Sequence, residues 1–168
     1  MRTKAQLRIL VVDDLSDVTT SIKEALIRDG FSPANVVECS SPEEAARLLK
    51  RSISHPEERF DVVTIDLYMH GDWWAGTDLC EFIKRKFHVS GDQHDKTQSI
   101  IYSTYVYSRY GNKESGYQID KLKHSKLMEM LEQYTRDGVI KAVLDKAIDD
   151  CHCELLKEIN KLVKEPSS

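Results

Sequence analysis

Residues 62–76 read VVTIDLYMHGDWWAG, and this stretch decides the fold. Its first four residues are apolar or β-branched, as is typical of a strand buried on both faces of a parallel sheet. The strand leads directly into Asp66, and a histidine, two tryptophans and a glycine follow closely. An acid at the end of a buried strand needs an explanation, because acidic side chains are seldom buried without a partner.

Segments with strand-like and helix-like patterns alternate along the rest of the chain. The strand-like segments are LRILVVDD (7–14), VVEC (36–39), SIIYST (99–104) and DGVIKAVLDK (137–146). Apolar residues recur at helical spacing in the segments 16–29, 42–51, 76–87, 119–134 and 148–163. This alternation predicts an α/β fold, in which a five-stranded parallel sheet has right-handed crossovers and helices on both faces.

The length of 168 residues fits one domain, with polar loop insertions near 52–60, 88–98 and 106–118. The net charge of −4 argues against binding nucleic acid by electrostatics alone, because no basic excess is present to release counterions. No apolar run has membrane-spanning length, and the N-terminal stretch does not resemble a secretory leader. We therefore expect a cytoplasmic protein with no membrane partner.

The cysteines give little indication of a metal site. Cys151, His152 and Cys153 form a CHC triplet, but it lies in a helix-like pattern, where residues two apart point in different directions. Structural zinc sites usually combine closely spaced pairs of ligands. We therefore expect reduced thiols here and at Cys39 and Cys80.

Polar residues collect where the predicted strands end. In open parallel sheets, ligands bind outside the carboxyl ends of the strands. Acids end the first and third strands, and hydroxyl and ammonium groups end the fourth and fifth; these residues are Asp13, Asp14, Asp66, Ser103, Thr104 and Lys146. Neighbouring carboxylates repel one another unless a cation lies between them, and oxygen ligands favour Mg²⁺. The sequence therefore predicts a magnesium and phosphoryl site at this edge.

Taken in order, these motifs resemble the receiver domain of two-component response regulators. VVDD (11–14) is similar to the acidic pair of that family, and IDLYMHGDWWAGTDL (65–79) is similar to its phosphoacceptor strand and loop. IIYST (100–104) resembles its hydroxyl-bearing strand, and LDKAID (144–149) its lysine motif. The resemblance covers about residues 7–163 and implies a flavodoxin-like, doubly wound sheet with strand order 2-1-3-4-5.

The resemblance also implies how the acids act. Asp66 would accept a phosphoryl group from a phosphohistidine on a histidine kinase or histidine phosphotransfer protein. Mg²⁺ would bind Asp14, Asp66 and the backbone carbonyl of Tyr68, while Asp13 would act through water. Such a protein signals to a downstream protein target through contacts and is not an enzyme, apart from catalysing its own phosphorylation and dephosphorylation.

The phosphoryl oxygens would be bound at the ends of the fourth and fifth strands. The alignment gives the hydrogen bond to Ser103 in preference to Thr104, and the ion pair to Lys146. Tyr68 and Tyr105 occupy positions that border the path of hydrolytic water in this family, so we expect slow loss of the phosphoryl group. A phosphatase with an aspartyl nucleophile is disfavoured, because Tyr68 replaces the second acid that such enzymes need.

Three single residues depart from the family pattern. His70 replaces the proline after the methionine, Ala147 replaces the proline after the lysine, and Val143 replaces the aromatic switch residue. Tyr102 and Tyr105 are nearby aromatic residues that could substitute for that switch. Because of these departures, a phosphorylation-independent pseudo-receiver that works as an adaptor stays open as an alternative.

Aromatic residues gather around the predicted site. Trp73 and Trp74 flank the acceptor loop, and Tyr105 precedes a tyrosine-rich insertion. Such side chains favour protein interfaces but also pack loops onto a sheet, and the sequence leaves both interpretations open. A homodimer through the fourth helix, fifth strand and fifth helix is compatible with the charged residues there, which are Lys121, Lys123, Lys126, Asp145 and Asp149.

Overall fold

The computed structural model describes residues 3–88, 97–104, 121–147, 149 and 152–164. Five strands in this part of the chain form one sheet in which all neighbouring strands are parallel. They are β1 (Ile9–Val12), β2 (Val36–Cys39), β3 (Val62–Ile65), β4 (Gln98–Tyr102) and β5 (Ile140–Leu144). The spatial order β2-β1-β3-β4-β5 confirms the predicted flavodoxin-like sheet.

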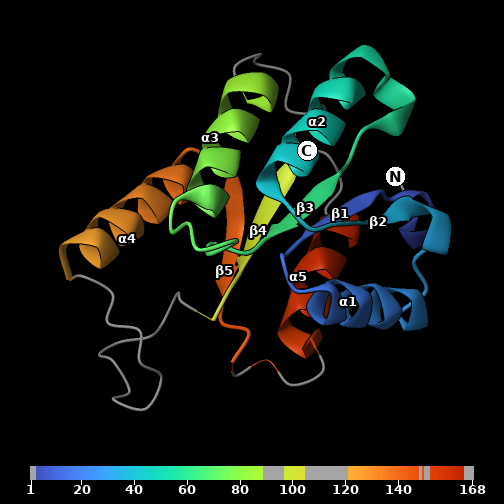
Figure 1. Ribbon diagram of the computed structural model, residues 1–168. Coiled ribbons are helices and arrows are strands. Elements are labelled where there is room, and N and C mark those ends of the chain that lie inside the picture. Colours follow the sequence, from blue (N-terminus) through green and yellow to red (C-terminus); the bar gives the residue numbers. More distant parts are fainter. Residues whose placement is uncertain (1–2, 89–96, 105–120, 148, 150–151, 165–168) are drawn as a thin grey trace.

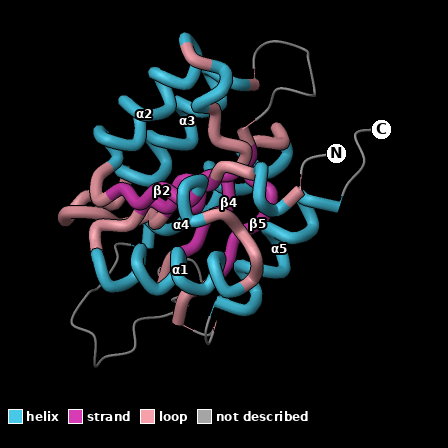
Figure 2. Tube along the Cα trace, turned by 90° about the vertical axis from the view of Figure 1, so that its right-hand side faces the viewer, coloured by secondary structure: helices cyan, strands magenta, loops and turns pink. Residues whose placement is uncertain are grey.

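Helices cover both faces of this sheet. The helices are α1 (Ser16–Arg28), α2 (Pro42–Ser54), α3 (Ala75–Phe87), α4 (Lys121–Arg136) and α5 (Cys153–Lys164). Figure 1 shows α1 and α5 on one face and α2, α3 and α4 on the other. In Figure 2 the strands lie between the two layers, with α2 and α3 above them and α1 and α5 below.

Alternate residues of the central strands enter two separate cores. Leu10 and Val12 of β1 pack with residues of α2, α3 and α4, whereas Ile9 and Val11 pack with residues of α1 and α5. All four side chains are at most 1% exposed. Burying an aliphatic side chain of this size contributes about 1.5–3 kcal/mol. The central strands are therefore held from both sides, which makes their carboxyl ends a rigid support for a site.

The sequence predicts a polar loop over residues 52–60, but part of this segment is helical. Residues 52–54 complete α2, and Pro56–Glu58 form a 3-10 turn. Ser52 is buried because its hydroxyl can donate to the carbonyl of Leu49, at 2.7 Å. This local hydrogen bond lets a polar residue continue the helix, which the composition of the segment does not reveal.

The last strand and helix are shorter than predicted. β5 ends at Leu144, so Lys146 lies in the following turn. The α5 helix begins at Cys153 instead of residue 148, because the Asp149 carboxylate accepts two backbone N–H groups of its first turn. Asp149 is 7% exposed, so this residue of the suggested dimer face is buried as a helix cap.

Some sequence predictions concern residues that the structure does not describe. Residues 89–96, the insertion 106–118, Tyr105 and Cys151 lie outside the described residues. Within the described ranges, no helix has the length and apolar character needed to cross a membrane.

Candidate functional site

Three carboxylates meet at the carboxyl edge of the sheet. Asp13 and Asp14 follow β1, and Asp66 follows β3. The two strands pair with Val12 opposite Ile65, so the acids after them lie at the same level. One oxygen from each carboxylate lies within 4.8 Å of the other two. The strand ends therefore bring together the acids that are far apart in the sequence.

Asp66 has a hydrogen-bond donor on each side-chain oxygen. Ser103 Oγ donates to Asp66 Oδ1 at 2.5 Å, and Lys146 Nζ donates to Asp66 Oδ2 at 2.7 Å. Lys146 also forms an ion pair with Asp13, so one ammonium group bridges two carboxylates. The side chains of Asp66 and Lys146 are only 7% and 9% exposed, which strengthens these charge-assisted bonds. Thr104, the alternative hydroxyl, is exposed.

One ammonium group among three acids sets the electrostatics. Burial raises the pKa of Asp13; Lys146 lowers it, Asp66 raises it again, and the net shift is upward. Burial alone would lower the pKa of Lys146, but the charges of Asp66 and Asp13 outweigh burial and raise it, so the lysine stays protonated. In this cluster the three carboxylates of Asp13, Asp14 and Asp66 outnumber the single ammonium group of Lys146 by two. That excess and the oxygen-only ligands fit one divalent cation such as Mg²⁺.

His70 contacts Asp14 in a way that proline could not. Its backbone N–H donates to Asp14 Oδ2 at 2.8 Å, and proline has no N–H. Its φ of 52° lies in the left-handed region, which the proline ring also excludes. The ring Nε2 lies 2.8 Å from the carbonyl oxygen of Ser40, which fixes the side chain against the end of β2. His70 therefore orients a candidate metal ligand, a role that the sequence analysis did not predict.

The loop after Asp66 returns very close to the strand end. Gly76 lies in the first turn of α3, and a Cβ atom placed there would be 2.4 Å from the carbonyl oxygen of Asp66 and 2.7 Å from Leu67 Cα. Only glycine permits this approach without movement. Met69 and Asp72 form a backbone bridge across the loop. This bridge closes the loop, and α3 begins against the acceptor position.

The aromatic residues of this loop pack on the protein. The rings of Tyr68 and Trp73 lie 4.5 Å apart between centroids. Trp74 packs against the core on the α2, α3 and α4 face, and Lys126 Nζ lies 5.7 Å from its ring centroid. All three rings are half-buried. Packing therefore accounts for Trp74, while Tyr68 also lines the cavity beside Asp66.

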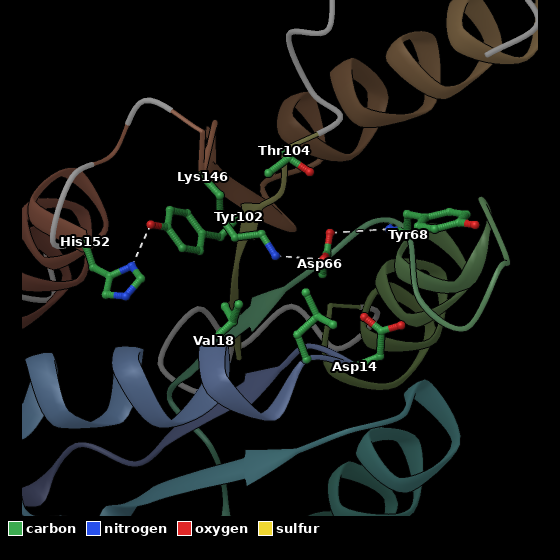
Figure 3. Close-up of a pocket in the computed structure, with 9 residues that line it drawn as sticks. Asp14, Val18, Asp66, Tyr68, Tyr102, Thr104, Lys146 and His152 are labelled. Atoms are coloured by element: carbon green, nitrogen blue, oxygen red, sulfur yellow. Dashed lines mark hydrogen bonds and ion pairs between the residues drawn. The ribbon is translucent and has the colours of Figure 1, made fainter. Parts of the chain in front are cut away.

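A cavity of about 400 Å³ opens beside the acceptor, as Figure 3 shows. It is lined by Asp14, Leu15, Val18, Asp66, Tyr68, Tyr102, Thr104, Lys146 and His152. His152 was missed in the sequence, where the CHC triplet was expected inside a helix. That expectation was wrong, since His152 precedes α5 with a φ of 59°. Its ring instead lies 2.7 Å from the hydroxyl of Tyr102.

Comparison with known proteins gives the same fold. No protein-family model matches the sequence, and no curated protein matches it as a relative. The receiver domain of the histidine kinase CKI1 from Arabidopsis thaliana is similar in structure, with a TM-score of 0.61, 20% identity and coverage of 96% of this chain and 95% of that chain. The response regulator domain of Thermotoga maritima CheB has a TM-score of 0.57 and 19% identity, covering 95% of this chain and 98% of its own.

A third similar structure includes ligands. The complex of CheX, CheY, BeF3 and Mg²⁺ from Borrelia burgdorferi has a TM-score of 0.61 and 17% identity, covering 95% of this chain and 90% of that chain. The chain therefore has the fold of response regulator receiver domains.

Proposed function

We propose that this chain is a phosphoacceptor receiver of a two-component or phosphorelay system, with Asp66 as the acceptor. The observation that carries the proposal is the environment of Asp66. It is buried at a strand end, both its side-chain oxygens accept hydrogen bonds, and two further carboxylates lie close by. This arrangement suits phosphoryl transfer, in which the protein mainly positions the reactants and neutralises charge.

The donor would be a phosphohistidine on a histidine kinase or histidine phosphotransfer protein. An oxygen of Asp66 attacks the phosphorus atom, and the phosphorus–nitrogen bond breaks. The electron pair of that bond leaves with the imidazole, which takes up a proton. Lys146 and Ser103, which now donate to Asp66, would then donate to oxygens of the transferred group.

The same edge would hold Mg²⁺. Asp14, Asp66 and the backbone carbonyl of Tyr68 would bind it directly, Asp13 would act through water, and the ion would neutralise charge on the phosphoryl oxygens. The fit rests on the oxygen ligands and on the two negative charges that Lys146 leaves unbalanced. The His70 N–H holds one oxygen of Asp14 in place, which reduces the ordering needed when the ion binds.

The alternative is a pseudo-receiver that binds partners without being phosphorylated. One observation favours it: Lys146 already pairs with both Asp13 and Asp66, which gives a closed ion-pair cluster. Buried ion pairs of this kind also occur where they only specify structure.

Intact mass spectrometry after incubation with Mg²⁺ and a small acyl phosphate separates the two functions. A receiver gains the mass of one phosphoryl group, and the Asp66→Asn variant gains none. The matched control is Asp78→Asn, which changes an exposed acid of α3 and leaves the adduct unchanged. A wild-type chain without an adduct supports the pseudo-receiver instead.

We further propose that the protein works in the cytoplasm and that its output is a contact with a downstream protein. The α4–β5–α5 face is the candidate dimer surface. Asp149 is buried in the cap of α5, so it provides no exposed charge for that contact. Lys126 is exposed, with its Nζ 5.7 Å from the ring centroid of Trp74, and its charge is available there. Asp145, which is half-buried, accepts the backbone N–H of Ala147.

A further inference from the structure

The turn that carries Lys146 has weak local support. The Lys146 N–H lies 3.4 Å from the carbonyl oxygen of Ser103, which is long for a hydrogen bond. The next N–H, that of Ala147, donates to Asp145 inside the same turn. Alanine also lacks the fixed φ that a proline would give. The ammonium group nevertheless reaches both Asp13 and Asp66, so the turn needs an anchor outside itself.

Tyr102 provides a link from the sheet to His152, six residues after Lys146. It is the last residue of β4, directly before Ser103, and it is 2% exposed. Figure 3 shows its ring pointing away from Asp66 and toward His152. The Tyr102 hydroxyl lies 2.7 Å from His152 Nδ1, and the two rings meet edge to face with centroids 5.6 Å apart. The end of β4, directly before Ser103, is therefore tied to His152, which follows Lys146 in the chain.

His152 extends the link to α1. Its Nε2 lies 2.9 Å from Ser21 Oγ, on the first helix. Its φ of 59° lies in the left-handed region, which is energetically costly for a residue other than glycine. Two ring hydrogen bonds offset that cost. Asp149, between Lys146 and His152, is fixed as the cap of α5.

The charges around this link keep both side chains in the forms that hydrogen-bond. Burial lowers the pKa of His152, Asp149 opposes this, and Lys146 and Arg28 lower the pKa further, so the net shift is downward. A neutral imidazole has one donor and one acceptor nitrogen, and here each has a hydroxyl partner. Burial and the charge of Asp149 raise the pKa of Tyr102, so its hydroxyl keeps its proton.

We propose that Tyr102 and His152 are positioning residues for Lys146. Their contact ties His152, directly before α5, to the end of β4, and this holds the ammonium group where it can bind the phosphoryl group on Asp66. The inference rests on the proposed phosphoacceptor function, since it assigns Lys146 its role in the transfer. Neither residue touches the reacting atoms in this scheme.

Four variants test the proposal. Tyr102→Phe removes only the hydroxyl that reaches His152. His152→Gly and His152→Asn both tolerate a left-handed backbone, but only asparagine keeps a polar group near the Nδ1 position. Lys146→Met gives the reference for complete loss of the ammonium group. The uptake rate from an acyl phosphate is measured against donor concentration at saturating Mg²⁺, and Mg²⁺ affinity is measured separately by tryptophan fluorescence.

We expect Tyr102→Phe and His152→Gly to lower the maximal rate by about tenfold, because Lys146 acts on the phosphoryl group in the transition state. Half-saturating donor concentration and Mg²⁺ affinity stay within about twofold, since the carboxylates are unchanged. His152→Asn recovers most of the rate. Wild-type rates in Tyr102→Phe and His152→Gly overturn the proposal, as does an equal loss of rate and Mg²⁺ affinity, or an asparagine variant as slow as the glycine variant.

Amide hydrogen exchange separates this proposal from the proposed function. In the absence of any phosphodonor, Tyr102→Phe and His152→Gly should accelerate exchange at residues 145–147 while β4 keeps its protection. Unchanged exchange at residues 145–147 overturns the positioning role, whatever the phosphorylation result. If the wild-type chain takes up no phosphoryl group, the proposed function is wrong, and the exchange data alone decide whether Tyr102 and His152 hold the turn.

Discussion

Replacing Gly76 with alanine tests how tightly the acceptor loop is packed. The added Cβ would lie 2.4 Å from the carbonyl oxygen of Asp66, and ordinary contact begins at 3.4 Å. The backbone of Asp66 or the start of α3 must therefore move by about 1 Å. The second contact, 2.7 Å to Leu67 Cα, is also with backbone, so no side-chain rotation relieves it.

The magnitudes favour a loss of both stability and rate in Gly76→Ala. Overpacking of this kind costs about 1–3 kcal/mol. Alanine favours the helix by about 1 kcal/mol relative to glycine, so the expected net loss is about 0–2 kcal/mol. A displacement of about 1 Å at a reacting group costs about 100-fold in rate, so we expect phosphorylation of Asp66 to slow by that order.

The control for Gly76→Ala is Gly138→Ala, in the turn between α4 and β5. Its φ of 73° makes alanine strained, but nothing lies within 4 Å of the added Cβ. It should lose about 1–2 kcal/mol of stability from backbone strain and keep the wild-type phosphorylation rate. The stability of both variants is measured by thermal unfolding, and the rate at which an acyl phosphate phosphorylates Asp66 is measured in each. A Gly76→Ala protein that is phosphorylated at the wild-type rate, or a Gly138→Ala protein that is equally slow, would refute the reasoning.

Three further variants probe charge and water access. Lys146→Met should tighten Mg²⁺ binding by about tenfold, because no ammonium then competes for Asp13 and Asp66; weaker binding in calorimetry contradicts this. Asp13→Asn should raise the midpoint of thermal unfolding at neutral pH, because the upward pKa shift of Asp13 makes its ionised form unfavourable. That cost is present above the folded-state pKa and disappears as the pH falls to the ordinary value of 3.8, so the gain should shrink in acid; a constant gain contradicts it. Tyr68→Ser should shorten the lifetime of the phosphorylated form by at least about threefold, because Tyr68 lines the cavity and limits water access; an unchanged lifetime rejects that shielding.

The central strands of the sheet could be predicted from the sequence, because a strand buried on both faces is a continuous apolar or β-branched run. VVTI and ILVV are continuous apolar or β-branched runs, and the structure buries every residue of both. The approach of Asp13 to Asp66 also follows from the sequence, since parallel strands end at the same edge of a sheet. The strand order came from the resemblance to receiver domains rather than from the periodicity.

The contacts of His70 and His152 could not be predicted in the same way. Both residues have positive φ angles, which depend on partners distant in the chain rather than on neighbouring residues. His152 lies in a segment whose periodicity continues into α5, so a helical pattern concealed the turn. The one available signal was at His70, where a residue with a backbone N–H replaces a proline, and that N–H binds Asp14.

Trp74 illustrates a choice that the sequence left open. An aromatic residue beside a predicted site fits an interface or a packed loop equally well. The contacts of Trp74 with the core and with Lys126 favour packing, and they depend on the position of α4, which no local pattern specifies.

The most direct test of the central claim is to locate the phosphoryl group chemically. Borohydride reduces an aspartyl phosphate to homoserine, which mass spectrometry of peptides can assign to a single position. After treatment with an acyl phosphate and Mg²⁺, the account predicts homoserine at position 66, dependent on Mg²⁺ and abolished in Lys146→Met. Conversion at Asp13 or Asp14 instead, or no conversion at any acid, would contradict it.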